Sequence, residues 1–372
     1  MRHPEALVPD APPSRTGEAP PPAAAACLVC GAASAERRFV QRGYSVFCCG
    51  GCGFEFVAPT PSTSELADYY ARSYAVPLEL YAAASDRNRR RIADLERWCP
   101  GRGRLLELGA SYGHSLALAR ERGWDVVGVE LSPTASEHAR THFGLAVYNC
   151  DLADAPLADG SFDAVIGWHV LEHVRNPKEQ LLRLAGLLKP GGVLGLRVPN
   201  IRSFGARVAG QWWPWMCPPA HLWFFSSATL PRLLRDCGFE VSEVRTLRGD
   251  GNNLYQYALM AAGSGLNELR LRLTAGRPCP ARPAARRDKA TASTGSSTGT
   301  TRSGTAFSPS GNSTPDMPEE PSVLLRAWLR LLTRAQPITN AMARATRPLI
   351  EPLERRGWGD ELLVYARRRD FS

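Results

Sequence analysis

The sequence predicts an α/β protein whose sheet is mostly parallel and is preceded by a small cysteine-bearing ribbon. Two observations carry this prediction. Residues 104–133 show the pattern of a strand, a glycine-bearing turn, a helix and a second strand, which is how parallel sheets begin. Residues 27–53 hold two C-x2-C pairs, a spacing typical of a small ribbon that a metal stabilises.

Composition limits the class of protein. The chain has 372 residues, 44% of them hydrophobic, which suits one α/β domain with appendages. No apolar run approaches the roughly 18 residues of a membrane-spanning helix, and no secretory signal pattern is visible, so we expect a cytoplasmic location. The net charge of +9 is compatible with nucleic acid binding, but no basic stripe interleaved with aromatic residues supports it.

Residues 1–100 are predicted to form three segments. Residues 1–26 are rich in Pro and Ala and are expected to form a disordered leader. Residues 27–60 form the ribbon, and residues 61–100 form a helical connector whose last helix, over residues 86–99, has an apolar face. Each cysteine pair of the ribbon is followed by glycine, and four thiolates match a closed, structural zinc site. The four cysteines are Cys27, Cys30, Cys49 and Cys52; Cys48 is a less regular substitute for Cys49.

The glycine turn suggests a nucleoside site. An apolar strand ends near Gly109 and Gly113, and the next strand ends on Glu130. Ligands of open α/β sheets bind beyond the carboxyl ends of the strands, where a carboxylate can bond a ribose diol. Ser111 stands where the dinucleotide fingerprint has its second glycine, which favours a nucleoside without a pyrophosphate.

The rest of the sheet follows from apolar runs between turn signals. Ser132 and Pro133 start a helix that ends at Gly144. Pro190 and Gly191 are expected to form a turn between a helix and a strand. The further strands are expected at residues 146–151, 161–169, 193–198, 239–247 and 360–368, with a helix at residues 226–237.

Several motifs together resemble a known family. The glycine turn with Glu130, the stretch S-F-D-A-V followed by H-V-L-E-H-V-R-N-P, and the segment P-A-H-L-W-F-F-S resemble class I S-adenosylmethionine-dependent methyltransferases. The ribbon with F-E-F-V-A-P-T-P is similar to the N-terminal zinc ribbon of a bacterial group that acts in sugar, surface-polysaccharide or natural-product pathways. The resemblance implies a Rossmann-like, seven-stranded sheet with an antiparallel last strand. It covers most of residues 27–250 and the last dozen residues.

The resemblance also implies the cofactor site. Glu130 would bind the ribose of S-adenosylmethionine and Asp151 the adenine amino group, although Asp151 can equally be read as a turn residue. The implied cofactor-binding residues are Glu107, Gly109, Ala110, Ser111, Tyr112, Gly113, Glu130, Leu131, Asp151, Leu152 and Trp168.

The acceptor-facing residues are expected just after the fourth strand. His169, Glu172 and His173 have the spacing of one helical face, and His221 is a further candidate. His169 and His221 are the favoured general bases. A divalent metal held by the H-x-x-E-H cluster is an alternative, and simple helix capping by Glu172 and His173 is another.

The expected acceptor is a hydroxyl of a sugar, a polysaccharide precursor or another small metabolite. The competing interpretation is a zinc-ribbon protein that associates with nucleic acid or methylates RNA. Residues 167–170 read G-W-H-V and not the N-P-P-Y/F motif of amino-group methylation on bases, which argues against it. A third interpretation is that the protein is a scaffold that does not bind the cofactor.

Two further regions bear on the site. Residues 205–225 are rich in tryptophan and either line the acceptor site or pack on the sheet. We expect the methyltransferase domain at residues 101–275, a disordered linker at residues 276–321 and a C-terminal part at residues 322–372. The latter includes an amphipathic basic helix near residues 323–332, suited to a membrane surface, its own domain or a second subunit.

Overall fold

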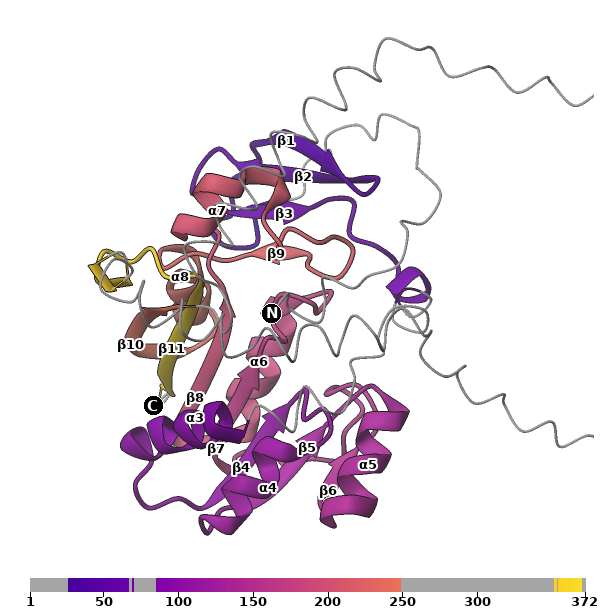
Figure 1. The fold of residues 1–372 in the computed structure, drawn as a ribbon, viewed down its shortest axis with the longest axis vertical. Coiled ribbons are helices and arrows are strands. Elements are labelled where there is room, and N and C mark those ends of the chain that lie inside the picture. Colours follow the sequence, from indigo (N-terminus) through magenta and orange to yellow (C-terminus); the bar gives the residue numbers. More distant parts are fainter. Residues whose placement is uncertain (1–25, 67–68, 70–84, 249–350, 353, 370–372) are drawn as a thin grey trace, which may run out of the picture. The chain divides into compact units, whose positions relative to one another are not determined.

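The computed structural model describes residues 26–66, 69, 85–248, 351–352 and 354–369 (Figure 1). All of them belong to one of the two compact units of the chain. They form a central seven-stranded sheet and a four-stranded ribbon sheet. The predicted leader, the linker and the helix near residues 323–332 lie outside the described residues.

The central sheet has the order β10-β11-β8-β7-β4-β5-β6. Strands β6, β5, β4, β7 and β8 are mutually parallel, and β11 runs antiparallel to both β8 and β10. The predicted seven-stranded sheet with an antiparallel last strand is therefore confirmed. The strands are β4 (Arg104–Leu108), β5 (Asp125–Val129), β6 (Ala146–Tyr148), β7 (Phe162–Trp168), β8 (Leu188–Pro199), β10 (Phe239–Leu247) and β11 (Glu361–Arg368).

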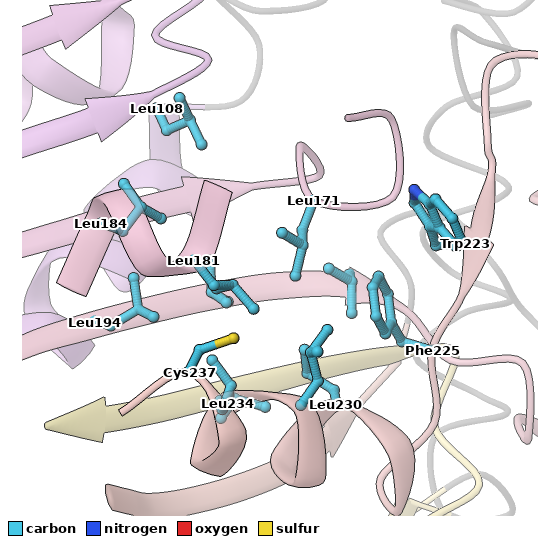
Figure 2. Close-up of a cluster of buried hydrophobic side chains, with 14 of the residues drawn as sticks. Leu108, Leu171, Leu181, Leu184, Leu194, Trp223, Phe225, Leu230, Leu234 and Cys237 are labelled. Atoms are coloured by element: carbon cyan, nitrogen blue, oxygen red, sulfur yellow. The ribbon is translucent and has the colours of Figure 1, made fainter. Parts of the chain in front are cut away.

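Helices cover both faces of this sheet, because its central strands are apolar on both sides. One face packs against α6 (Pro177–Leu187) and α8 (Thr229–Asp236), through leucines such as Leu181 and Leu234 (Figure 2). The other face packs against α3 (Ser85–Trp98), α4 (His114–Glu121) and α5 (Pro133–Phe143). The sequence predicts the start and end of α5: the Ser132 hydroxyl caps it, Pro133 occupies its first turn and Gly144 ends it in the left-handed conformation.

The ribbon sheet joins two distant parts of the chain. Its order is β1 (Ala35–Gln41), β2 (Tyr44–Cys49), β3 (Glu55–Val57) and β9 (Trp223–Phe224). Because β9 lies in the tryptophan-rich segment, this segment extends the ribbon by one strand. Phe54 stacks on Trp223 with ring centroids 6.1 Å apart. Buried residues of both sheets, such as Val46 and Leu194, belong to one hydrophobic core.

Two local predictions are wrong. The H-V-L-E-H stretch is not helical: residues 171–173 form a turn and α6 begins only at Pro177. Asn176 caps that helix by accepting a hydrogen bond from the Glu179 N–H, which fixes the helix start after the motif. The turn at Pro190 and Gly191 lies inside β8, as a bulge that shifts the register between Leu188 and Val193.

The tryptophan-rich segment holds a short helix, α7 (Phe204–Ala209), and a single 3-10 turn, η2 (Gly210–Trp212), before β9. Among the described residues, no helix is both long and apolar enough to cross a membrane.

Candidate cofactor and acceptor site

The carboxyl ends of four neighbouring parallel strands bring the predicted cofactor residues to one edge of the sheet. Leu108 of β4 pairs with Val129 of β5 and with Gly167 of β7, so the residues that follow these three positions are neighbours. They include Gly109, Glu130 and Trp168. Asp151 follows β6 at the end of the same edge.

The glycine turn adopts a left-handed backbone where the sequence requires it. Gly109 and Gly113 have φ values of 69° and 84°. A Cβ on Gly113 would lie 2.8 Å from the Cβ of Ala139, so this glycine allows the turn to pack against α5. A Cβ on Gly109 would lie 2.5 Å from Val170, so a side chain already uses the space that this glycine leaves.

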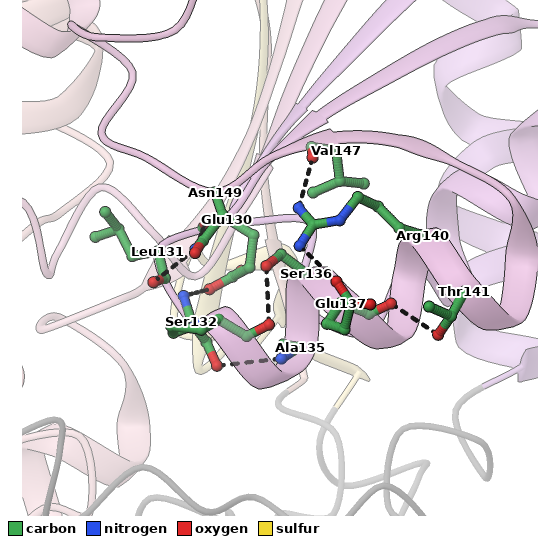
Figure 3. Close-up of polar contacts among 11 residues, drawn as sticks. Glu130, Leu131, Ser132, Ala135, Ser136, Glu137, Arg140, Thr141, Val147 and Asn149 are labelled. Atoms are coloured by element: carbon green, nitrogen blue, oxygen red, sulfur yellow. Dashed lines mark hydrogen bonds and ion pairs between the residues drawn. The ribbon is translucent and has the colours of Figure 1, made fainter. Parts of the chain in front are cut away.

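Glu130 is held in one orientation by backbone amides. Its Oε2 accepts a hydrogen bond from the Ser111 N–H at 2.8 Å, and its Oε1 accepts one from the Ser132 N–H at 2.7 Å. Burial raises the pKa of the carboxyl, and these N–H donors oppose the rise. Asn149 fixes the following loop by donating to the carbonyl oxygens of Glu130 and Leu131 (Figure 3).

The carboxyl of Glu107 is buried at the end of β4, and its Oε2 has no hydrogen-bond partner. Burial raises its pKa to about 8, although Ser115 and Arg91 oppose the rise. The guanidinium of Arg91, on α3, lies 5.5 Å from the ring centre of Trp168. Arg91 therefore reaches the same edge of the sheet, which its position in a run of helical arginines did not reveal.

The remaining predicted cofactor residues divide into exposed and buried positions. Leu131 is 65% exposed. Asp151 is exposed and its Oδ1 accepts a hydrogen bond from the Ala153 N–H at 3.0 Å, as expected of a turn residue. Leu152 and Ala110 are buried, whereas Tyr112 is half-buried.

His169 lies between two carboxylates. Its Nδ1 is 3.3 Å from Glu172 Oε1 and its Nε2 is 3.4 Å from Glu361 Oε2. Burial opposes the charge of the imidazole, but Glu361 and Glu172 outweigh burial and raise the pKa of His169. Glu361 also pairs with Arg197, and burial is outweighed by Arg197 and His169, which hold the pKa of Glu361 well below its usual range.

Glu361 and Arg197 were missed by sequence reasoning. The only signal is an acidic pair, Asp360 and Glu361, at the start of an otherwise apolar strand. The acidic pair can be assigned to the site only when β11 is known to lie beside β8, because Glu361 pairs with Pro199 in the register of the sheet.

Trp215 contacts two of the three candidate histidines, and Glu172 lies close to all three histidines. The ring of Trp215 stacks on His169 at 5.1 Å and on His221 at 5.5 Å. Metal-ligating atoms of Glu172, His173 and His221 lie within 4.8 Å of one another. The structure thus groups Glu172 and His173 with His221, and it places His169 outside this group.

The tryptophans of residues 205–225 serve the core as well as the site. Trp213, Trp215 and Trp223 are buried in the main hydrophobic cluster, and Trp215 also stacks on His169 and His221. The expected packing role is therefore confirmed for this segment, and the lining of the acceptor site stays a prediction.

The four predicted zinc ligands converge. All four sulfur atoms lie within 4.8 Å of one another, with Cys27 and Cys52 at 3.7 Å and Cys30 and Cys49 at 3.5 Å. The glycine after each pair, Gly31 and Gly53, has a positive φ and donates its N–H to the carbonyl of the first cysteine. Cys48 is not a member of this group.

Comparison with known proteins identifies a domain type. Residues 80–244 match a family model described as a methyltransferase domain. The chain is 30% identical over 146 residues to a protein named "Probable S-adenosylmethionine-dependent methyltransferase" of Mycolicibacterium smegmatis, covering 39% of this chain and 54% of the relative.

Two further relatives carry names that include a methylated atom. A ubiquinone biosynthesis O-methyltransferase of Cereibacter sphaeroides is 32% identical over 159 residues, 40% of this chain and 64% of the relative. A dimethylglycine N-methyltransferase of Parasynechococcus marenigrum is 30% identical over 161 residues, 38% of this chain and 58% of the relative. The chain spans less than two thirds of the length of each of these three relatives. The matched domain and the seven-stranded sheet support a class I S-adenosylmethionine-dependent methyltransferase.

Proposed function

We propose that this protein is an S-adenosylmethionine-dependent methyltransferase that methylates a hydroxyl of a small molecule. The acceptor class we favour is a sugar, a polysaccharide precursor or a secondary metabolite. The observation that carries the proposal is the Glu130 carboxylate, which the amides of Ser111 and Ser132 hold at the carboxyl end of β5. A ribose diol is the ligand that such a carboxylate binds in sheets of this kind.

The residues at the sheet edge fit the rest of the cofactor. Glu107 Oε2 lacks a hydrogen-bond partner in a buried position, and an unpaired buried acceptor is costly. The ammonium of the cofactor's methionine part would supply the missing donor. Leu131 exposes an apolar side chain that would cover the adenine ring, and Asp151 would bind the adenine amino group.

The turn residues and Trp168 complete the proposed cofactor site. Ala110, Tyr112 and Gly113 belong to the loop that we propose approaches the cofactor, Leu152 is buried next to Asp151 in the sequence, and Trp168 lies beside Arg91. The cofactor supplies an activated methyl group on a sulfonium, which is a good leaving group. The protein therefore has to orient the acceptor and remove a proton from it.

We propose His169 as the base and Glu361 as the group that orients it, because the His169 Nε2 faces the ionised Glu361 carboxylate. A carboxylate that fixes one ring nitrogen leaves the other to accept a proton. Glu172 lies 3.3 Å from that nitrogen, Nδ1, and His173 follows in the same turn. His221 is the second candidate base, and it ranks behind His169 because the Glu361 carboxylate faces His169.

A structural zinc ion is proposed for the ribbon. Four converging sulfurs with backbone N–H groups beside them, such as the Gly51 N–H at 3.3 Å from Cys49 Sγ, fit a closed tetrahedral site. The Val57 N–H of β3 donates to the Leu222 carbonyl at 2.9 Å, so the ribbon supports the residue next to His221. Reduced thiols at this site also fit the cytoplasm, where we propose that the enzyme acts.

Replacing Glu130 by Ala is expected to weaken S-adenosylmethionine binding by about 1.5–3 kcal/mol, the value of hydrogen bonds to a charged group. Isothermal titration calorimetry on the full-length protein measures the change. Glu137→Ala is the matched control, because Glu137 is an exposed carboxylate of α5 that pairs with Arg140. The absence of any cofactor binding by the unaltered protein would reject the enzyme and favour the scaffold.

The raised pKa of Glu107 predicts how the free energy of unfolding depends on pH in the absence of cofactor. The folded state holds the proton up to about pH 8, whereas the unfolded chain releases it near its ordinary pKa of 4.5. Stability is therefore lost as the pH rises through this window. Glu107→Gln should flatten the pH dependence, with a change of roughly 1–3 kcal/mol for a buried unpaired acceptor. Urea unfolding at several pH values tests it, and equal slopes for both proteins would contradict the expected effect.

His169→Asn is expected to lower turnover by about 10²–10⁴-fold, the usual contribution of a general base, with cofactor binding unchanged. Glu361→Gln should move the rise of turnover with pH to lower pH, because the carboxylate no longer raises the pKa of His169. His142→Asn, on the exposed side of α5, is the control. The pH–rate profiles of the variants measure the loss of turnover and its shift along the pH scale. Unchanged turnover in both His169→Asn and His221→Asn would reject both candidate bases.

Cys30→Ser is expected to lose the zinc ion, whereas Cys48→Ser keeps it, because only Cys30 belongs to the converging group. Elemental analysis of the purified proteins measures zinc per chain. Since the ribbon supports Leu222 and not the glycine turn, Cys30→Ser should also lower turnover more than it weakens cofactor binding. Equal zinc content in the two variants would contradict the proposed site.

A further inference from the structure

We propose that Glu172, His173 and His221 form a binding site for a divalent transition-metal ion, distinct from the four-cysteine site. Their ligand atoms lie within 4.8 Å of one another. Two imidazoles and one carboxylate are a ligand set found at catalytic zinc and non-haem iron sites. The H-x-x-E-H spacing alone does not produce this set, because its third member comes from residue 221.

The orientation of both imidazoles suits a metal. The Nδ1 of His173 is 2.9 Å from the carbonyl oxygen of Ala220, and the Nδ1 of His221 is 2.8 Å from the carbonyl oxygen of Trp215. A carbonyl only accepts hydrogen bonds, so each Nδ1 carries the proton. This tautomer leaves Nε2 as the metal-binding nitrogen, which is how metal-ligating histidines are usually fixed by their neighbours.

Glu172 supplies the second, independent observation. It is completely buried, and neither carboxylate oxygen makes a well-aligned hydrogen bond. A buried carboxyl whose oxygens lack well-aligned hydrogen bonds is costly, and a metal ion would satisfy those oxygens.

Backbone and side-chain hydrogen bonds hold the two contributing segments together. The Leu222 N–H donates to the Glu172 carbonyl at 2.9 Å, and the Trp223 Nε1–H donates to the Val174 carbonyl at 2.7 Å. Together with the bond from His173 to Ala220, they fix residues 172–174 against residues 220–223. A site whose supports are fixed in this way needs little rearrangement to bind an ion.

The role of the ion rests on the proposed methyltransferase function. Three protein ligands leave coordination positions open, and an acceptor hydroxyl in one of them would have its pKa lowered. The O–H bond then breaks and its proton passes to His169, which lies beside Glu172. The new O–CH₃ bond forms as the S–CH₃ bond breaks, and the sulfonium becomes a neutral thioether.

Cobalt(II) gives a test that does not depend on activity. Co²⁺ is titrated into the full-length protein whose four-cysteine site already contains zinc. We expect one further equivalent to bind, with the weak visible absorption of nitrogen and oxygen ligands and without a sulfur-to-cobalt charge-transfer band. No further binding, or binding with that band, overturns the proposal.

Matched variants separate this ligand set from the sequence motif. Glu172→Gln and His221→Asn should each weaken Co²⁺ binding by more than the roughly 10–100-fold that loss of an outer-shell partner costs. His169→Asn should retain the binding, because His169 lies outside the group. Loss with His169→Asn and retention with His221→Asn would instead indicate the H-x-x-E-H set and overturn the proposal.

Cofactor calorimetry keeps the two proposals distinguishable and reports on folding. A His221→Asn protein that binds S-adenosylmethionine normally but not Co²⁺ is folded, and its result supports the metal site. If the unaltered protein binds Co²⁺ at this site but no cofactor, the metal site stands and the methyltransferase function falls. If the unaltered protein binds the cofactor but not Co²⁺, only the proposed metal site is rejected.

Discussion

The buried carboxylate of Glu361 is the interaction on which the arrangement of the site depends. It pairs with Arg197 of β8 and with His169 at the end of β7, so three strands meet through one charge. An ion removed from water is tolerated only when partners of this kind surround it. Ion pairs of Glu361, as well as backbone hydrogen bonds, therefore hold β11 between β8 and β10. The Glu361 carboxylate also orients the proposed base, His169.

A second constraint comes from the side of the ribbon. Strand β9 lies within the residues that match the methyltransferase-domain family model, and it pairs with the ribbon sheet. Trp215 and Leu222, near β9 in the sequence, contact the candidate catalytic residues. The ribbon is thus integrated with the proposed acceptor side of the site, whereas the proposed cofactor side is formed by β4, β5 and their turns. This division explains why local sequence predicts the residues proposed to bind the methyl donor and does not predict those proposed to face the methyl acceptor.

Local patterns predicted the positions of the strands along the chain, the caps of α5, the glycine turn and the convergence of the four cysteines, because each depends on residues close in sequence. Three features were not predicted, the first for a local reason and the other two because they depend on tertiary contacts. The H-V-L-E-H stretch has helical spacing but forms a turn, because Asn176 and Pro177 start the helix later. Arg91 and Glu361 reach the site only through the packing of α3 and the insertion of β11. The grouping of His221 with Glu172 and His173 requires two segments that the sequence separates by almost fifty residues.

The place of β11 in the sheet has a consequence for synthesis. Strand β10 ends at Leu247 and β11 begins at Glu361, yet β11 lies between β10 and β8. During translation, β8 and β10 are both made long before the strand that joins them. Until then each presents an unpaired edge, which is a template for pairing with other chains. A chain truncated before residue 361 would therefore be prone to aggregate, and the synthesis of β11 is the step that closes the sheet.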